Sequence, residues 1–329
     1  MIITRTPFRI TLGGGGTDLP AYYEKYGGFL ISAAINKYIY ITVNKRFEKS
    51  IRVSYSKTEI VNGADEIQHP IVREALKLVD IKSNIEITSI ADLPAKSGLG
   101  SSCSFTVGLL NALHAYKKEY LQPKELAEEA FHIEAEILKE PIGKQDPYIA
   151  AYGGIISMDI DTKGNVKVDT HVLNEDVIDG LESNLLYFYT GLQRSASEVL
   201  AQQTTSVKKD ENEVINAMHQ IKEICKETLA RLKSGDIDWF GKSLDMHWNI
   251  KKKISNKMSN SFIDRCYSIA IENGAIGGKI MGAGGGGFFM FYCNNSHKPR
   301  LRQAIIEQGL EEVRFRIEHE GSKILVNLR

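Results

Sequence analysis

The amino-acid sequence predicts an α+β protein built from two closely joined parts. In the first part, short stretches rich in β-branched and aromatic residues alternate with glycine turns, which is typical of strands. From about residue 180 onward, long stretches with apolar residues at helical spacing predominate. The 329 residues give room for two domains and a sizeable core, and we place the domains at residues 1–178 and 179–329.

The individual elements follow from periodicity and from the residues at their ends. Strands are predicted at 2–12 (interrupted at Pro7), 35–43, 51–55, 85–90, 185–189, 278–281, 288–293 and 323–328. Helices are predicted at 70–79, 102–117, 123–138, 195–207, 211–233, 236–254, 261–273 and 297–309. Ser101 or Ser102 would cap the second helix, and Pro123 would start the third. Lys163-Gly164-Asn165 predicts the turn of a hairpin between residues 153–160 and 165–172.

Composition excludes several classes of function. The net charge is +0, which argues against general nucleic-acid binding because that function relies on excess Lys and Arg. The four cysteines are scattered and form no CxxC pair, so we expect reduced thiols and no structural zinc. No signal-peptide core and no membrane-spanning apolar run is present. We therefore expect a cytoplasmic protein with neither nucleic acid nor a membrane as partner. We also expect it to be a monomer or homodimer.

The run Leu93-Pro-Ala-Lys-Ser-Gly-Leu-Gly-Ser-Ser102 is the most informative segment. Small residues surround Leu99, and apolar residues at helical spacing begin at Phe105. A glycine-rich turn that leads into a helix offers free N–H groups and a positive dipole end to an anion, most often phosphate. No Lys follows the glycines, so the segment is not a Walker A motif. The structural alternative is a tight turn before a core helix.

Two further glycine-rich segments support a ligand site. Gly282-Ala-Gly-Gly-Gly-Gly287 contains G-x-G-x-x-G, but a predicted strand follows it, whereas the dinucleotide-binding fingerprint requires a helix there. A nicotinamide-dependent oxidoreductase is therefore disfavoured, and a glycine hairpin that approaches a ligand or another loop fits better. Gly13-Gly-Gly-Gly-Thr-Asp18 contains four consecutive glycines, and Arg9 and Asp18 are polar groups on either side of them. Ordering glycines costs more entropy than ordering other residues, so we expect this turn to need a backbone conformation that glycine allows.

A fourth segment carries candidate acidic groups. In His132-Ile-Glu-Ala-Glu136, the two glutamates lie two residues apart and therefore point to different faces of a helix, so one of them could hold a cation. In Gly143-Lys-Gln-Asp-Pro147, Asp146 lies in a predicted loop where a functional carboxylate could be exposed. Each carboxylate taken singly also fits a solvated surface charge.

Three of these segments, in this order, resemble the motifs of the GHMP kinase superfamily. They are Pro7-Phe-Arg-Ile-Thr-Leu-Gly-Gly-Gly-Gly-Thr-Asp18, Leu93-Pro-Ala-Lys-Ser-Gly-Leu-Gly-Ser-Ser102 and Lys279-Ile-Met-Gly-Ala-Gly-Gly-Gly-Gly287. The resemblance covers essentially the whole chain. It implies an N-terminal domain like ribosomal protein S5 domain 2, a ferredoxin-like C-terminal domain, and an active site in the cleft between them.

The resemblance also implies ATP and Mg²⁺ as cofactors and assigns roles to residues. Asp146 would be the catalytic base and Arg9 the basic residue beside it. Ser102 and Glu136 would be the Mg²⁺ ligands, although the residues by themselves leave the choice between Glu134 and Glu136 open. ATP would be bound by Lys96, Ser97, Gly98, Leu99, Gly100, Ser101 and Ser102. The acceptor would be bound by Gly15, Gly16, Thr17, Asp18, Arg194, Gly284 and Gly285.

Within the superfamily, the segment from Gly13 to Pro20 resembles the D-glycero-D-manno-heptose 7-phosphate kinase branch most. The implied reaction phosphorylates O1 and yields the 1,7-bisphosphate, for nucleotide-activated heptose used in surface polysaccharides. One departure is Pro147 after Asp146, where galactokinases have Gln, so the path of the chain there would differ. A fucokinase-like or galactokinase-like enzyme acting on a free sugar is the alternative. A non-catalytic sugar-nucleotide sensor would lack the base or a metal ligand, and none is missing here.

An acceptor that already carries a phosphate needs its own basic site. The candidates are Arg194, Lys144 and the run Lys251-Lys-Lys253. We favour Arg194, because the planar guanidinium suits phosphate and because it follows Gly191 in a predicted loop. The three lysines fit a solvated helix face, and His247 and Trp248 on the same predicted helix fit ordinary packing.

Overall fold

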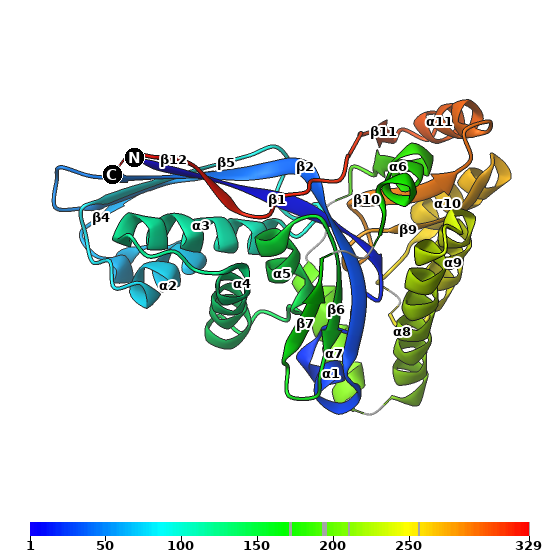
Figure 1. The fold of residues 1–329 in the computed structure, drawn as a ribbon, viewed down its shortest axis with the longest axis horizontal. Coiled ribbons are helices and arrows are strands. Elements are labelled where there is room, and N and C mark those ends of the chain that lie inside the picture. Colours follow the sequence, from blue (N-terminus) through cyan, green and yellow to red (C-terminus); the bar gives the residue numbers. More distant parts are fainter. Residues whose placement is uncertain (171–172, 193–195, 210, 256, 329) are drawn as a thin grey trace.

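Two β-sheets form the centre of the fold (Figure 1). The computed structural model describes residues 1–329 apart from 171–172, 193–195, 210, 256 and 329. Its first sheet has the order β12 (Lys323–Asn327), β1 (Ile2–Gly13), β2 (Gly28–Lys45), β5 (Ile85–Ala91), β3 (Ile51–Ser54) and β4 (Thr58–Val61). The hairpin of β6 (Ile155–Ile160) and β7 (Val166–Asp169) joins the same sheet through β2. Only β3 and β5 are parallel neighbours among these described pairs.

The strand β2 is long enough to have different partners along its length. Its first part pairs with β6 and its last part with β5, while β1 runs antiparallel along most of it. The interruption predicted at Pro7 is a shift of register between Pro7 and Phe8, and the strand continues to Gly13. Proline lacks the N–H that a regular ladder needs, so an irregularity at this position is expected.

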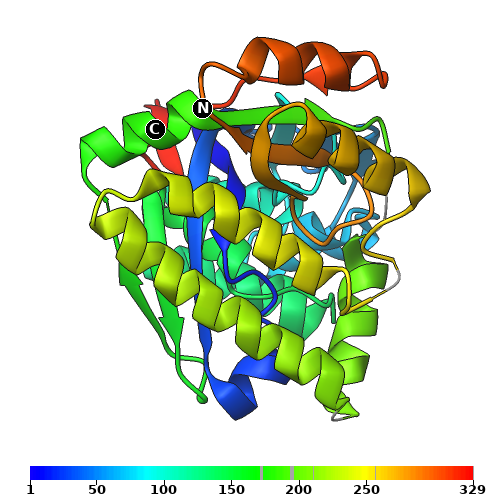
Figure 2. The same cartoon turned by 90° about the vertical axis from the view of Figure 1, so that its right-hand side faces the viewer.

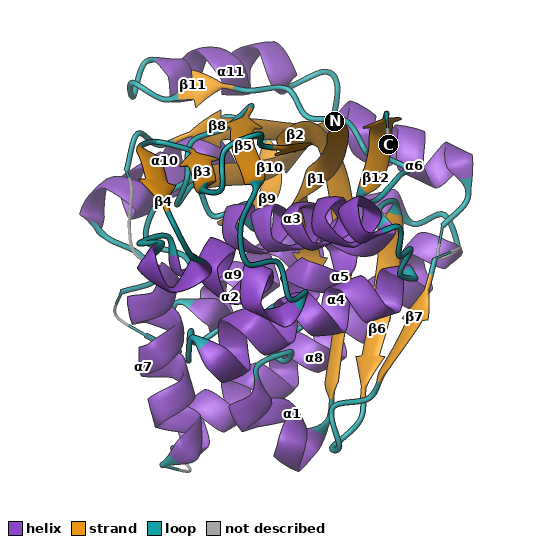
Figure 3. Ribbon diagram, turned by 90° about the vertical axis from the view of Figure 1, so that its left-hand side faces the viewer, coloured by secondary structure: helices purple, strands orange, loops and turns teal. Residues whose placement is uncertain are grey.

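Helices cover one face of the first sheet (Figures 1 and 3). They are α2 (Pro70–Leu78), α3 (Ser101–Lys117), α4 (Pro123–Phe131) and α5 (Gln145–Tyr152), with short helical turns at Ala64–Glu66 and His132–Ile137. Pro123 starts α4 as predicted, but the predicted continuation to residue 138 is a π-helical segment. The expected serine cap of α3 is wrong: Gly100 is the N-cap, and no side chain caps the helix.

The second sheet has the order β11 (Glu311–Glu312), β8 (Leu185–Tyr189), β10 (Phe288–Cys293) and β9 (Ala275–Ile280), all antiparallel. The strand β10 is buried along its whole length, which explains its unbroken apolar sequence. The helices α6 (Glu175–Asn184), α10 (Ser261–Glu272) and α11 (Lys298–Ile306) belong to this part. The sequence prediction omitted α1, α5, α6, β4 and β11, which are all short.

Two long helices connect the two sheets. The long helices α8 (Asn212–Lys233) and α9 (Ile237–Lys251) lie side by side (Figure 2). α8 packs on β2, whereas α9 packs on β9. The helices α1 (Pro20–Tyr26) and α7 (Ala196–Lys208) contact each other, and α7 also contacts α8; in Figure 1 they lie to the left of the lower half of α8. The α+β class is confirmed, while the boundary at residues 178 and 179 stays a prediction, and β12 returns to the first sheet.

Within the described ranges, we find no helix that combines the length and the apolar character required to cross a bilayer.

Candidate active site

The 93–100 loop connects β5 to the N-terminus of α3. Lys96, Gly98 and Gly100 have φ values of +62°, +82° and +77°, so the backbone turns back on itself before the helix begins. Leu99 anchors the loop: its side chain is buried, and its carbonyl accepts a hydrogen bond from the backbone N–H of Arg9 (3.1 Å). The N–H groups that precede Ser104 have no partner within α3, so the open end of the helix can bind an anion.

The 282–287 loop packs directly behind the 93–100 loop. A Cβ atom added to Gly282 would lie 2.5 Å from the carbonyl oxygen of Gly98, and one added to Gly287 would lie 2.4 Å from that of Ser97. Backbone therefore meets backbone at both positions, which only glycine permits. The expected support of one glycine loop by the other is present in the structure. Gly284 and Gly285, expected to bind the acceptor, instead pack on Met258, and Gly285 donates its N–H to the Met258 carbonyl.

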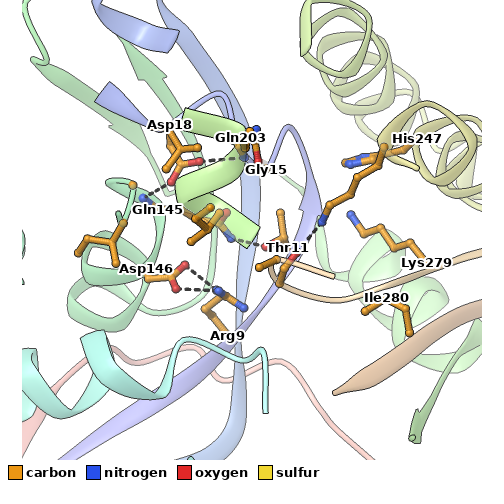
Figure 4. Close-up of a pocket in the computed structure, with 18 residues that line it drawn as sticks. Arg9, Thr11, Gly15, Asp18, Gln145, Asp146, Gln203, His247, Lys279 and Ile280 are labelled. Carbon is orange, nitrogen blue, oxygen red and sulfur yellow. Dashed lines mark hydrogen bonds and ion pairs between the residues drawn. The ribbon is translucent and has the colours of Figure 1, made fainter. Parts of the chain in front are cut away.

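Arg9 and Asp146 form a bidentate ion pair beside the 93–100 loop (Figure 4). Arg9 Nε donates to Asp146 Oδ1 and Nη2 donates to Oδ2, both at 2.7 Å, while Nη1 donates to the Gly98 carbonyl at 2.7 Å. Burial opposes the charge on Arg9, but the Asp146 carboxylate raises its pKa, so the guanidinium stays charged. The Asp146 side chain is 24% exposed, so its oxygens can still reach a ligand.

The sequence predicted Asp146 in a loop, and this prediction is wrong. Asp146 lies in the first turn of α5. Pro147 follows it within that turn, where proline is tolerated because the first N–H groups of a helix lack partners. The positive end of the α5 dipole also favours a carboxylate at this position. The proline that makes the sequence look irregular is therefore compatible with a helix N-terminus.

Glu134, and not Glu136, faces the 93–100 loop. Ser102 Oγ donates to Glu134 Oε2 (2.5 Å), and Thr106 Oγ1 donates to Glu134 Oε1 (2.6 Å). Burial raises the pKa of Glu134, and these two hydrogen bonds oppose the rise. Glu136 pairs with His132 on the surface, and its side chain is 60% exposed. The expectation of Glu136 beside Ser102 is therefore wrong, and the π-helical segment sets which carboxylate points inward.

The 13–18 loop is held by its own polar groups. Asp18 accepts hydrogen bonds from the backbone N–H groups of Gly16 and Gln145, both at 3.0 Å, and burial raises its pKa while these bonds lower it. Thr17 is fully buried, and its hydroxyl lies 2.8 Å and 3.0 Å from the carbonyls of Gly14 and Phe29. Thr17 therefore braces the loop, and the expectation that it contacts the acceptor is wrong.

Three neighbouring cavities meet around these residues. The inner cavity is lined by Arg9, Thr11, Gly15, Gly16, Asp18, Gln145, Asp146, Gln203, His247, Lys251, Lys279, Gly282 and their neighbours (Figure 4). The loop cavity, of about 300 Å³, is lined by Arg9, Lys96, Gly98, Gly100, Ser101, Ser102, Glu134, Asp146, Gly282 and others. The aromatic cavity, of about 610 Å³, is lined by Phe8, Tyr55, His69, Leu93, Lys96, Ser101, Ser102, Phe105 and others. Arg9 and Asp146 belong to both of the first two cavities, so they lie where these two meet.

The basic residues of the inner cavity were predicted only in part: Lys251 was one candidate for a phosphate site, His247 was expected to pack, and Lys279 was not considered. His247, Lys251 and Lys279 come from α9 and β9, and His247 and Lys279 approach from the side opposite Asp18 and Asp146 (Figure 4). Lys251 was expected on a solvated face, but it is only 9% exposed, and Lys279 is 2% exposed. Lys279 stands in the third glycine motif, and that position was the available signal. Lys144 instead pairs with Glu128 at 2.7 Å, and Arg194 lies outside the described residues.

The chain is similar to known proteins along nearly its whole length. The family models described as GHMP kinases N terminal domain and GHMP kinases C terminal match residues 70–154 and 210–310. The chain is 31% identical to D-glycero-alpha-D-manno-heptose 7-phosphate kinase of Campylobacter jejuni, over 98% of each protein. It is 24% identical to galactokinase of Pyrococcus furiosus, over 97% of this chain and 96% of that protein.

A solved structure gives the same architecture. The crystal structure of a D-glycero-D-manno-heptose 1-phosphate kinase from Bacteroides thetaiotaomicron matches with a TM-score of 0.82 and 25% sequence identity, and the match covers 100% of both chains. The expected two-domain arrangement is therefore confirmed.

Proposed function

The chain belongs to the GHMP kinases, and on that premise we propose that it transfers the γ-phosphoryl group of ATP to O1 of D-glycero-D-manno-heptose 7-phosphate. The product would be the 1,7-bisphosphate, an intermediate toward nucleotide-activated heptose. The family membership establishes an ATP-dependent sugar kinase, and the similarity to heptose phosphate kinases supports a heptose phosphate as acceptor. The position of the Arg9–Asp146 pair, which lines both the loop cavity and the inner cavity, carries the proposal.

Each cavity has a distinct role in this proposal. The apolar and aromatic walls of the aromatic cavity would hold the adenine base, because flat rings bury their faces well against such side chains. The 93–100 loop and the free N–H groups of α3 would hold the phosphates in the loop cavity. The sugar would occupy the inner cavity, with Asp18 and the glycines of the 13–18 loop beside its hydroxyls.

The chemical step follows from the residues at the junction. Asp146 accepts the proton of the O1 hydroxyl as that oxygen bonds to the γ-phosphorus and the bond from this phosphorus to the ADP oxygen breaks. Arg9 holds both carboxylate oxygens of Asp146 and keeps the group ionised. Its charge also opposes the negative charge that develops on the transferred group.

Ser102 and Glu134 fit a magnesium site. Mg²⁺ prefers oxygen ligands and takes few of them from the protein, and this pair supplies one hydroxyl and one carboxylate next to the expected phosphates. Glu134 is buried without a cationic partner among the described residues, and a bound cation would compensate its charge. When bound, Mg²⁺ neutralises charge on the β- and γ-phosphate oxygens.

A pair of substitutions distinguishes the two glutamates. We expect Glu134→Gln to raise the Mg²⁺ concentration needed for half-maximal activity by about tenfold or more, because a carboxylate ligand becomes a weaker amide ligand. Glu136→Gln should leave this concentration unchanged, since its side chain lies on the surface. Titration of activity with MgCl₂ at saturating ATP and acceptor measures both variants. Equal behaviour of the two would contradict the assignment of Glu134.

The substrate is tested with purified protein, ATP and Mg²⁺ against a panel of acceptors. We expect turnover to be fastest with heptose 7-phosphate and to give a new anomeric phosphate signal in ³¹P NMR. The same heptose without phosphate, galactose, fucose and mevalonate complete the panel. Faster turnover of galactose, fucose or mevalonate would reject the heptose assignment and would leave the kinase activity in place.

A further inference from the structure

Two buried lysines face the inner cavity without an acidic partner. Lys251 extends from the last turn of α9 and donates to the Gly282 carbonyl, and Lys279 extends from β9 and donates to the Leu12 carbonyl at 3.2 Å. Within the described part of the chain, neither lysine forms an ion pair with a carboxylate. Each ammonium has three N–H donors, and the hydrogen bonds above use one of them.

The carboxylates of the same cavity are already engaged. Both oxygens of Asp146 accept from Arg9, and both oxygens of Asp18 accept from backbone N–H groups. The cavity therefore contains three cationic side chains and two carboxylates, and Arg9 and Asp146 neutralise each other. Two ammonium groups and the Asp18 carboxylate remain, so positive charge is in excess even when Asp18 is ionised. Buried charges are normally paired, so two unpaired ammonium groups indicate that an anionic ligand completes the site.

The phosphates of ATP would lie in a different cavity from the two lysines. The loop cavity, with the free end of α3, is not lined by either lysine, and both lie in the cavity beyond Asp146. Figure 4 shows Lys279 approaching from the side opposite Asp146 and Asp18. An acceptor with one end at Asp146 would thus present its other end to the lysines.

We propose that Lys251 and Lys279 bind the phosphate group that the acceptor already carries, an inference that rests on the proposed kinase function. A phosphate monoester is close to a dianion at neutral pH and is matched by two ammonium groups. Lysine binds phosphate as a point charge with several donors. Neutral His247, buried beside them, can add a hydrogen bond. This site makes the enzyme selective for sugar phosphates over the corresponding free sugars.

The charges around the lysines give the site a defined pH dependence. Burial, and then repulsion from Lys251, lowers the pKa of Lys279 to about 7, with Arg9 adding to the decrease and Cys225 opposing it. Burial, and then repulsion from Arg9, lowers the pKa of Lys251 to about 8, and Asp18 opposes this decrease. Burial and both lysines lower the pKa of His247, which is therefore neutral.

A bound dianion favours the protonated lysines, so binding weakens when they lose protons. We therefore expect kcat/KM for the phosphorylated acceptor to fall relative to that for the free sugar as the pH rises from 7 to 9. The ratio of these two kcat/KM values is used because groups that act on both acceptors affect both values equally, so their titration cancels.

The test uses Lys251→Met and Lys279→Met, with Lys253→Met as the matched control. Methionine keeps much of the buried chain length and removes the charge, and the melting temperature of each variant shows whether the fold is retained. Lys253 is exposed near the end of the same helix. For each buried lysine we expect kcat/KM for heptose 7-phosphate to fall about 10²-fold or more, since breaking a buried charge contact is costly. Activity on free heptose should fall far less than activity on heptose 7-phosphate, and all parameters of Lys253→Met should change less than about threefold.

Calorimetric titration of the protein with heptose 7-phosphate without ATP gives a readout independent of turnover. Loss of this binding in both variants, with the melting temperature retained, supports the proposal. Equal loss of activity on phosphorylated and free heptose, or a rise in KM for ATP alone, would overturn it. If the wild-type enzyme prefers another sugar phosphate and still depends on both lysines, the heptose assignment fails while the phosphate site stands. A wild-type preference for free sugars would overturn both.

Discussion

Replacement of Asp146 by asparagine is expected to lower kcat by about 10²–10⁴-fold, while ATP still binds. The amide has nearly the shape of the carboxylate but cannot accept the proton of the attacking hydroxyl. Arg9 would keep its hydrogen bond to the Gly98 carbonyl, so the 93–100 loop should retain its position. A coupled assay of ADP release gives kcat, and calorimetric titration with a non-hydrolysable ATP analogue gives the affinity.

The control for this variant is Asp176→Asn, which changes an exposed carboxylate in the first turn of α6. Its kcat should equal that of the wild-type protein. If Asp146→Asn kept near-normal turnover, another group would have to act as the base. If it lost ATP affinity in parallel with kcat, Asp146 would be needed to organise the loop rather than to move a proton.

Replacement of Gly282 by alanine is expected to raise the KM for ATP and to lower kcat/KM for ATP by about 10²-fold, because small displacements of phosphate-binding groups have effects of this size. The added methyl group would lie 2.5 Å from the Gly98 carbonyl oxygen and 3.0 Å from its Cα. Both contacts are with backbone, so the 93–100 loop itself must move. Steady-state kinetics with varied ATP measure the effect.

The matched control is Gly309→Ala. Gly282 and Gly309 have φ values of +68° and +85°, so alanine is strained by about 1–2 kcal/mol at either position. An added Cβ at Gly309, however, has no atom within 4 Å. Gly309→Ala should therefore lower the melting temperature and leave the KM for ATP unchanged. Unchanged ATP kinetics in Gly282→Ala would show that the 282–287 loop does not position the 93–100 loop.

Local sequence patterns were sufficient to predict the 93–100 loop and most of the long helices and strands. A glycine-rich turn and the helical spacing after Phe105 involve neighbours in sequence, so α3 and its open N-terminus could be predicted. The same reasoning failed for α5. Asp146 and Pro147 lie in its first turn, but aspartate and proline are common both in loops and in the first turn of a helix. Nothing in the sequence distinguishes these two settings.

The choice of the glutamate that we propose as a Mg²⁺ ligand required the tertiary structure. Glu134 and Glu136 lie two residues apart, and the sequence shows only that they face different directions. Contact with Ser102 and Thr106 on α3 selects Glu134, and this contact depends on how the π-helical segment packs against α3.

The sequence by itself determined the fold class and the three glycine loops, because each is encoded by residues that are close together in the chain. The type of chemistry followed from the resemblance of these loops to the motifs of the GHMP kinases. The tertiary structure decided which charged groups share a cavity. Lys251 and Lys279 are far apart in sequence, and lysine is usually found on the surface. The packing of α9 on β9 nevertheless buries both side chains beside the 13–18 and 282–287 loops. Burial is a property of the packed elements and not of the residue type. The sequence could therefore name Lys251 as one candidate among several, and only the folded chain shows that it is buried beside Lys279 in the inner cavity.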